Sequence, residues 1–413
     1  MVWLHGRTPP KFGTCKTVVK TIILLVATMA TYFVSKTARS RVGPPVEQAS
    51  ARISPSQEIR SRHYETLDAL RGVAALAVLL LHTGYYLENE DLARSAYLAV
   101  DFFFILSGFV VAHAYDAKLG RHLPAARFLY LRMIRLYPLH LAGILIGGAV
   151  LIPAALAGDF RLSAGEIGLA AVLGSLFLPW PFPLQPPHLF PLNPPAWSLF
   201  FEVLANSAYG LAHRWLSQHV LIAMVAAAGA ALCVKAAVTG TIDGGVRWYS
   251  FEAGLARVFF SFPLGVLVFR WRARIPARLG AWGPWPLLAV LLLLCLPTVP
   301  APWRALYDLA FVSLAAPMLV AAGTQASPSA AARPFFLVLG AISYPLYALH
   351  EPLRGWLLAG AESLGLEGRA AGLAYLGAIV PIAWAAAPLD AAIRRRLLRR
   401  SRGTADRISS TSP

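Results

Sequence analysis

Several ionisable side chains lie inside long apolar stretches of this sequence, where a polar group is costly unless it is paired or does chemistry. Arg71 and His82 belong to one such run, LDALRGVAALAVLLLH. Eleven residues of helix rise about 16 Å, so Arg71 is expected near the inner surface and His82 in the outer half. Imidazole can act as a general base near neutral pH. The alternative is an Asp68–Arg71 pair that anchors the helix, with His82 a core histidine.

Two later helices carry a carboxylate into apolar sequence. Asp101 precedes three phenylalanines and is expected near the outer end of its helix. Ser198 and Glu202 are four residues apart, so a helix presents both on one face, with Glu202 in the outer half. An unpaired glutamate there indicates a functional or network role. Ser107, followed by a glycine, is interpreted as a site of close helix packing.

A basic stretch and a proline-broken helix supply further candidates. Arg132 and Arg135 are three residues apart, so a helical turn would present both, and paired guanidinium groups suit phosphate. Simple anchoring by positive charge is the alternative. Tyr347 and His350 follow helical spacing in LGAISYPLYALHEP. The second histidine of a zinc-binding HExxH motif is missing, because position 354 is Arg, so no metal site is expected.

Composition sets the class of protein. Hydrophobic residues make up 57% of the 413 residues and charged residues 14%, against about 25% charged in soluble domains. The chain is therefore predicted to be an all-α polytopic integral membrane protein. The net charge of +17 does not indicate nucleic-acid binding, because the arginines cluster at the ends of apolar runs. Three scattered cysteines exclude a disulfide framework.

The charge pattern predicts about ten core transmembrane helices. Both ends of the core are basic and are expected in the cytoplasm, which requires an even number of crossings. Segment 165–179 is the shortest and precedes the Pro-rich stretch 179–195, so 158–195 is expected to be an outer loop or re-entrant element. The apolar segments are 67–87, 96–115, 137–157, 165–179, 196–213, 217–235, 252–270, 284–300, 304–323, 335–358 and 370–389.

The remaining chain is divided by composition. Residues 1–66 form a basic N-terminal segment with an extra apolar stretch at 18–34. That stretch either spans the membrane, lies on its surface or belongs to a start site placed too early. Residues 67–390 form the membrane domain, and 391–413 a basic cytoplasmic tail. No internal repeat is found.

Five motifs, in this order, resemble the acyltransferase-3 family of multi-pass membrane acyltransferases. They are LDALRGVAALAVLLLH (67–82), DFFFILSGFVV (101–111), RFLYLRMIRLYP (127–138), PAWSLFFE (195–202) and LGAISYPLYALHEP (339–352). The resemblance covers residues 67–390 and leaves the N-terminal 66 residues outside. It implies transfer of an acyl group, usually acetyl, from acyl-coenzyme A to a hydroxyl of a carbohydrate or glycoconjugate, with no bound cofactor.

The resemblance also implies roles for residues. His82 would be the catalytic base, functionally paired with Arg71, and Glu202 would share the catalytic site. Arg71, Arg132 and Arg135 would hold the phosphates of acyl-coenzyme A. The residues expected to bind substrate are Asp68, Asp101, Trp197, Ser198, Tyr347 and His350.

These roles fit the predicted topology. The donor is expected to enter from the cytoplasm, its thioester arm running between the arginines and an outer group of His82, Glu202 and His350. The acceptor is expected from the outer side, over Trp180, Trp197 and the Pro-rich loop. Expected partners are acyl-coenzyme A, a carbohydrate and the lipid bilayer, in a bacterial inner (cytoplasmic) membrane.

Three alternatives remain open from sequence alone. A transporter or flippase of a lipid-linked or acylated saccharide would also use buried charges and broken helices, although such proteins often show two related halves. A polysaccharide polymerase or glycosyltransferase would usually need a larger outer loop. A non-catalytic scaffold would not need His82, Glu202 and His350.

Overall fold

The described regions are predominantly α-helical, as predicted. The computed structural model describes residues 63–158, 161–182 and 188–410, and the apolar stretch 18–34 lies outside them. In these regions the extended structure is a single bridge between His188 and Arg247. The helices are α2 (Glu65–Thr83), α3 (Ala99–Leu119), α4 (Ala125–Leu156), α5 (Ala164–Ser175), α6 (Ala196–Ala212), α7 (Gln218–Thr239), α8 (Phe251–Arg270), α9 (Pro284–Cys295), α10 (Ala301–Ala310), α11 (Ala316–Gln325), α12 (Arg333–Ser363) and α13 (Gly368–Ser410).

Short turns connect several of these helices. The 3-10 turns include η2 (Gly84–Leu87) after α2 and η4 (His213–Trp215) after α6, and the π-helical turn η8 (Phe311–Ala315) joins α10 to α11. α5 starts with a capping box, in which Ser163 and Glu166 bond each other's backbone nitrogens. These hydrogen bonds lower the pKa of the exposed Glu166 carboxyl.

Seven described segments are long and apolar enough to cross a membrane: Glu65–Leu87, Ala96–Leu119, Ala125–Leu156, Gln218–Thr239, Trp248–Arg270, Ala301–Gln325 and Gly368–Arg399. α5 and α9 have 12 residues each, or about 18 Å, against a hydrocarbon core of about 30 Å. The length of α5 agrees with the prediction that 165–179 does not cross, whereas α9 is shorter than its apolar run suggested. The protein is a multi-pass membrane protein, and the count of ten crossings stays a prediction.

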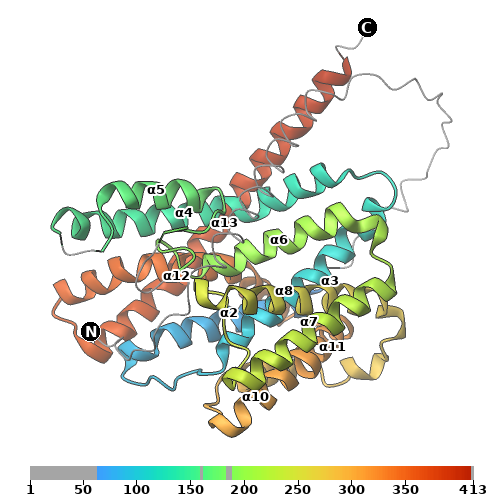
Figure 1. Ribbon diagram of the computed structural model, residues 1–413, viewed down its shortest axis with the longest axis horizontal. Coiled ribbons are helices and arrows are strands. Elements are labelled where there is room, and N and C mark those ends of the chain that lie inside the picture. The colour runs from blue at the N-terminus through green and yellow to red at the C-terminus, as the bar shows by residue number, and fades with distance from the viewer. Residues whose placement is uncertain (1–62, 159–160, 183–187, 411–413) are drawn as a thin grey trace. The chain divides into compact units, whose positions relative to one another are not determined.

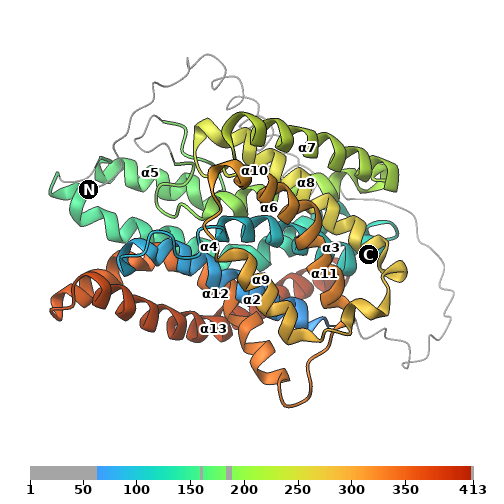
Figure 2. The ribbon, with the colours of Figure 1, turned by 90° about the horizontal axis from the view of Figure 1, so that it is seen from below.

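Three groups of helices surround the interior. α2 packs on α12, which also packs on α13; α3 packs on α8, which also contacts α7; and α4 packs on α5, α6 and α12. Figures 1 and 2 show α4 and α5 side by side at one flank and α7 beside α8 at another. Helices that are distant in sequence, α2 and α12 above all, thus become neighbours.

Glycines permit close contacts in two of these helix pairs. A Cβ on Gly72 of α2 would lie 2.4 Å from the Leu339 carbonyl oxygen, and one on Gly340 of α12 would lie 2.7 Å from the Asp68 Cβ. In the other pair, a Cβ on Gly108 of α3 would lie 2.0 Å from the Phe262 oxygen of α8. The glycine that follows Ser107 therefore has the packing role predicted for it.

The predicted inner ends of several helices meet in one ionic cluster. The Asp116 carboxylate, near the end of α3, contacts Arg270 Nη2 at the end of α8 and His213 Nε2 in η4, both at 3.0 Å. Tyr209 of α6 donates to the same carboxylate. The loops that the charge pattern assigned to one side thus lie together in the structure.

The structure changes two predicted boundaries. α4 starts at Ala125, about three turns before the apolar run at 137, so Arg132 and Arg135 belong to the helix and not to a loop. α13 continues from Gly368 to Ser410, so the boundary predicted at 390/391 falls inside a helix. The helix is longer than the apolar run in both places: α4 begins before its run, and α13 continues after its run. Hydropathy marks only the apolar part of each helix.

The close contact of α2 with α12 can be tested with one substitution at two positions of the same helix. Gly340→Ala should lower the melting temperature of the purified protein, corresponding to about 1–3 kcal/mol, because the methyl group collides with Asp68. Gly360→Ala is the matched control, because nothing lies within 4 Å of a Cβ at Gly360. Equal melting temperatures for the two variants would contradict this packing.

Candidate active site

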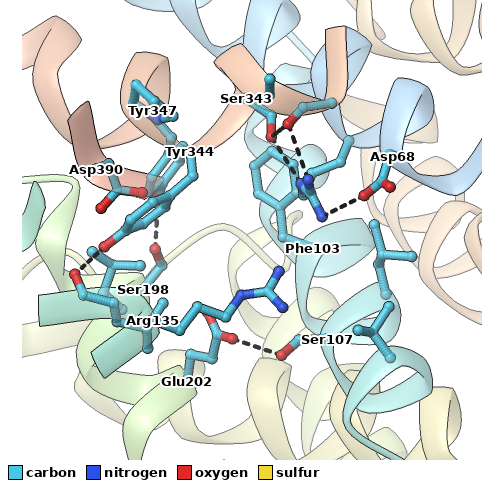
Figure 3. A pocket seen from close by; sticks show the side chains of 18 of the residues that line it. Asp68, Phe103, Ser107, Arg135, Ser198, Glu202, Ser343, Tyr344, Tyr347 and Asp390 are labelled. Carbon is cyan, nitrogen blue, oxygen red and sulfur yellow. Dashed lines mark hydrogen bonds and ion pairs between the residues drawn. The ribbon is translucent and has the colours of Figure 1, made fainter. Parts of the chain in front are cut away.

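A cavity of about 420 Å³ lies between α2, α3, α4, α6, α12 and α13. Its volume is in the range of small-molecule sites. Figure 3 shows that polar side chains from helices far apart in sequence converge on it. Seven of the residues predicted from sequence line this pocket: Asp68, Arg71, Arg132, Arg135, Ser198, Glu202 and Tyr347.

Arg71 is fixed on one wall by three groups. Its Nη1 lies 2.9 Å from the Asp68 carboxylate, one turn earlier in α2. Its Nε donates to the Ser343 hydroxyl at 2.8 Å, and its Nη2 donates to the Gly340 carbonyl at 3.0 Å. The other Asp68 oxygen lies 2.9 Å from His63 Nε2. The close contact of α2 and α12 therefore holds the Arg71 guanidinium in one orientation.

Arg132 and Glu202 form an ion pair on the opposite wall. Arg132 Nη2 donates to Glu202 Oε1 at 2.8 Å, and the Ser107 hydroxyl donates to the same oxygen at 2.6 Å. The Arg132 side chain is buried, yet its Nε has no hydrogen-bond partner among the described residues. An unpartnered buried N–H of a guanidinium beside a cavity favours an anionic or acceptor-rich ligand.

A third wall comes from α4 and α13. Arg394 Nη2 lies 2.6 Å from Asp390 Oδ2, and both residues line the pocket. Arg135 lines it as well and forms no ion pair with any carboxylate in the described regions. Four guanidinium groups and three carboxylates thus line the pocket, which leaves an excess of one positive charge.

The other end of the pocket is apolar. Val100, Phe103, Phe104 and Leu199 line it together with Tyr347, whose hydroxyl lies 2.6 Å from the Ser198 hydroxyl. The Phe103 and Tyr347 rings pack edge to face at 5.5 Å between centroids. The site is therefore a cavity with charged walls and one aromatic end.

His82 and His350 lie beyond this aromatic end and are not among the described residues that line the pocket. The Tyr347 and His350 ring centroids are 6.0 Å apart, so Tyr347 contacts the pocket on one side and the histidine pair on the other. His82 Nδ1 and His350 Nε2 are 2.8 Å apart, and the rings are stacked. The expected open path from the arginines to His82 is thus closed here by Phe103 and Tyr347.

The hydrogen bonds of His350 determine the protonation of both rings. His350 Nδ1 lies 3.1 Å and 2.9 Å from the carbonyl oxygens of Leu346 and Tyr347, which can only accept. Nδ1 therefore carries the hydrogen, and the neutral ring has its lone pair on Nε2. His82 must then donate from Nδ1, which leaves the lone pair of His82 on Nε2. His82 is oriented as a base by this bond.

Comparison with known proteins adds to this geometry. The profile of an acyltransferase domain family, acyltransferase-3, matches residues 64–387. This chain belongs to the acyltransferase-3 family. It is an acyltransferase of the multi-pass membrane class, and its family therefore favours catalysis over transport.

One relative and one negative result complete the comparison. "Protein 2 in picA locus" of Rhizobium radiobacter is 41% identical to this acyltransferase over 176 residues, which is 39% of this chain and 89% of that protein. No solved structure matches the chain at a significant level.

The structure separates some residues of the acyltransferase that the sequence placed together. Glu202 was expected in the outer half with His82, but it lies against Arg132 in the arginine pocket. The reason is that α6 runs from the level of Tyr347 toward the arginines, and the long Arg132 side chain reaches the carboxylate. Arg71 and His82 do not contact each other, since each is bonded to α12 instead.

The two tryptophans over which the acceptor is expected to approach are both buried. The Trp197 side chain is 8% exposed and packs against Phe104 and Phe201. Trp180 is 2% exposed, and neither residue lines the pocket. Tryptophan at the rim of a bundle often lies in an aromatic belt, but here aromatic rings cover Trp197, and a cluster of aliphatic side chains that includes Ile144, Ile167 and Leu192 covers Trp180.

Asp101 is also placed away from the pocket. Its carboxylate accepts from Arg257 Nη2 at 2.7 Å and from Arg257 Nε at 3.1 Å, and both side chains are fully buried. Arg257 also donates to the carbonyls of Gly244 and Tyr97 at 2.8 and 2.9 Å. This pair connects α3 to α8, so Asp101 has a structural partner, and its predicted role in substrate binding stays a prediction.

Sequence reasoning missed four residues of these sites: Ser107 as a partner of Glu202, Arg257, Asp390 and Arg394. Arg257 is an arginine in the middle of a predicted span, and the rule that selected Glu202 would have selected it. Asp390 and Arg394 follow i,i+4 spacing at the end of an apolar run. Arg394 fell in the predicted tail 391–413, whereas Asp390 is the last residue of the predicted membrane domain, so the two were not considered as a pair.

The Asp101–Arg257 pair predicts a double-mutant result. Asp101→Asn should cost about 3–5 kcal/mol of stability, because it removes the buried counter-ion of Arg257 and leaves only the exposed Asp243 at 3.6 Å. Asp101→Leu combined with Arg257→Met should recover most of this loss. Thermal unfolding of the purified proteins measures both. An unchanged melting temperature with a raised substrate KM in Asp101→Asn would instead support the substrate-binding role that the sequence suggested.

Proposed function

We propose that the protein transfers an acyl group, most simply acetyl, from acyl-coenzyme A to a hydroxyl of a carbohydrate or glycoconjugate. One observation carries this proposal. A pocket with excess guanidinium charge ends in apolar and aromatic residues, and behind Tyr347 lies His350, which is hydrogen-bonded to His82. Acyl-coenzyme A has the matching order of groups, with phosphates at one end and a thioester at the other.

The charged walls would hold the nucleotide end of the donor. Arg135, which has no carboxylate partner in the described regions, and the unpartnered Nε of Arg132 are the groups best placed to bind phosphate oxygens. Glu202 and Ser107 hold Arg132 in position for this contact. Arg71, fixed by Asp68 and Ser343, would contribute a third cation.

The apolar end would receive the thioester arm. Phe103 and Tyr347 close this end, and Tyr347 contacts His350 behind it. Movement of these two rings would bring the thioester to His82. The bond between the Ser198 and Tyr347 hydroxyls would then break and re-form with each opening.

The chemical step would use the lone pair on His82 Nε2. The acceptor oxygen attacks the thioester carbonyl carbon while His82 Nε2 takes its proton. The carbon–sulfur bond breaks, and the leaving thiolate takes the same proton from His82, so no net proton is released. His350 accepts from His82 Nδ1 throughout and stabilises the imidazolium. In the alternative route, His82 Nε2 attacks the thioester first and passes the acyl group to the acceptor.

The acceptor is proposed to approach from the end of α2 that carries His82. His82 is half-buried, and the exposed Tyr85 and the partly exposed Tyr86 follow it in η2. These two rings, and not Trp180 or Trp197, are the aromatic side chains near His82 available to a sugar. A bacterial inner membrane, with acyl-coenzyme A in the cytoplasm, is the proposed location.

The central test is removal of the imidazole. His82→Ala should abolish transfer of labelled acetyl from acetyl-coenzyme A, because it removes the Nε2 lone pair that takes the proton of the acceptor hydroxyl. Membrane insertion and melting temperature should change little. His122→Ala, an exposed histidine in the loop after α3, is the control and should keep full activity. A fully active His82→Ala protein would reject the proposed mechanism.

The donor pocket gives a second, separable prediction. Arg135→Ala should raise the KM for acyl-coenzyme A by about 10- to 100-fold with a smaller effect on kcat, because a charge-assisted bond contributes about 1.5–3 kcal/mol. Arg132→Ala added to it should raise the KM further. Arg121→Ala, which removes an exposed arginine outside the pocket, is the control. An unchanged KM in the double variant would refute phosphate binding here.

A further inference from the structure

Three potential metal ligands converge outside the pocket. His82 of α2 and His350 and Glu351 of α12 each offer one ligand atom, and these atoms all lie within 4.8 Å of one another. The proposed transfer uses the two histidines and gives Glu351 no role. The sequence shows no zinc motif here, because the two histidines lie on different helices, and His82 and His350 are 268 residues apart in sequence.

Hydrogen bonds orient His350 and Glu351 so that each has an atom available to a cation. His350 Nδ1 donates to backbone carbonyls, which is the outer contact that metal-bound histidines usually make, and its Nε2 lone pair points to His82. The Glu351 carboxylate is held by Arg354 through Oε2 at 2.6 Å, which leaves Oε1 for another partner.

The distances require only a small adjustment. Zinc binds histidine nitrogen at about 2.0–2.1 Å, so tetrahedral geometry places two ligand nitrogens about 3.3 Å apart. His82 Nδ1 and His350 Nε2 are now 2.8 Å apart, so the two rings need to separate by about half an ångström. Glu351 is a flexible side chain that can approach the same point.

We propose that His82, His350 and Glu351 bind a divalent transition-metal ion of the zinc class. Two imidazole nitrogens favour zinc or cobalt over magnesium or calcium, which prefer oxygen ligands. His82 and Glu351 are half-buried and His350 is buried, and none of the three lines the arginine pocket.

Metal binding would switch the His82 tautomer. A metal on Nδ1 requires the lone pair there, so the hydrogen of the neutral ring moves to Nε2 and no proton is released. Nε2 then cannot accept a proton from the acceptor hydroxyl. The ion would therefore inhibit acyl transfer, a consequence that rests on the proposed function, whereas binding itself does not.

Binding is tested on the purified full chain after removal of any histidine tag. Titration with Co²⁺ should give visible absorption bands that saturate at one ion per chain, and Zn²⁺ should displace the Co²⁺. Glu351→Gln should weaken binding by about 10-fold or more, and His350→Gln should remove the bands. Glu362→Gln, an exposed acid on the same helix, is the matched control and should bind like the wild type. Absence of saturable binding, or equal binding by all four proteins, would overturn the site.

Activity is measured separately. Zn²⁺ should inhibit transfer by the wild type and by Glu362→Gln, the inhibition should be reversed by a chelator, and Glu351→Gln should need about 10-fold more Zn²⁺. Zinc bound at this site without inhibition would overturn the tautomer switch. If no acyl-coenzyme A is turned over at all, the proposed function fails, and the Co²⁺ titration still decides the metal site.

Discussion

A charge buried among membrane helices has to be matched by a partner, and this requirement organises the polar interior of the protein. Asp101 with Arg257 connects α3 to α8, and Asp116 with Arg270 connects the far ends of the same helices. Glu202 with Arg132 connects α6 to α4. Because each pair joins two helices, the ion pairs set which helices are neighbours, and the apolar contacts fill the space between them.

The same requirement marks the pocket as a place for a ligand. In the described regions, the pairing of charges is incomplete there, since Arg135 has no carboxylate and Arg132 Nε and Asp390 Oδ1 have no hydrogen-bond partner. A bound anion with hydrogen-bond donors of its own would complete these contacts. The histidine pair behind Tyr347 is different, because its hydrogen bonds are complete and only one lone pair is left to react.

Much of this organisation could be predicted from sequence, and the exceptions have a common cause. Composition indicated the class of fold, the cost of buried charge selected Arg71 and Glu202 for the site, and the spacing of the two guanidinium groups selected Arg132 and Arg135. What sequence could not supply is the partner across helices. Glu202 was placed with His82 because its depth was counted along α6 alone, whereas the reach of Arg132 decides its position. His350 could be named, but its bond to His82 depends on the contact of α2 with α12.

The length of α13 has a mechanical consequence. Asp390 and Arg394 form a wall of the pocket, and the same helix continues without a break to Ser410. An unbroken helix moves largely as one body, so its two halves are mechanically coupled. The pocket wall and the segment after Arg394 therefore belong to one helix, and a displacement of that segment would also move Asp390 and Arg394.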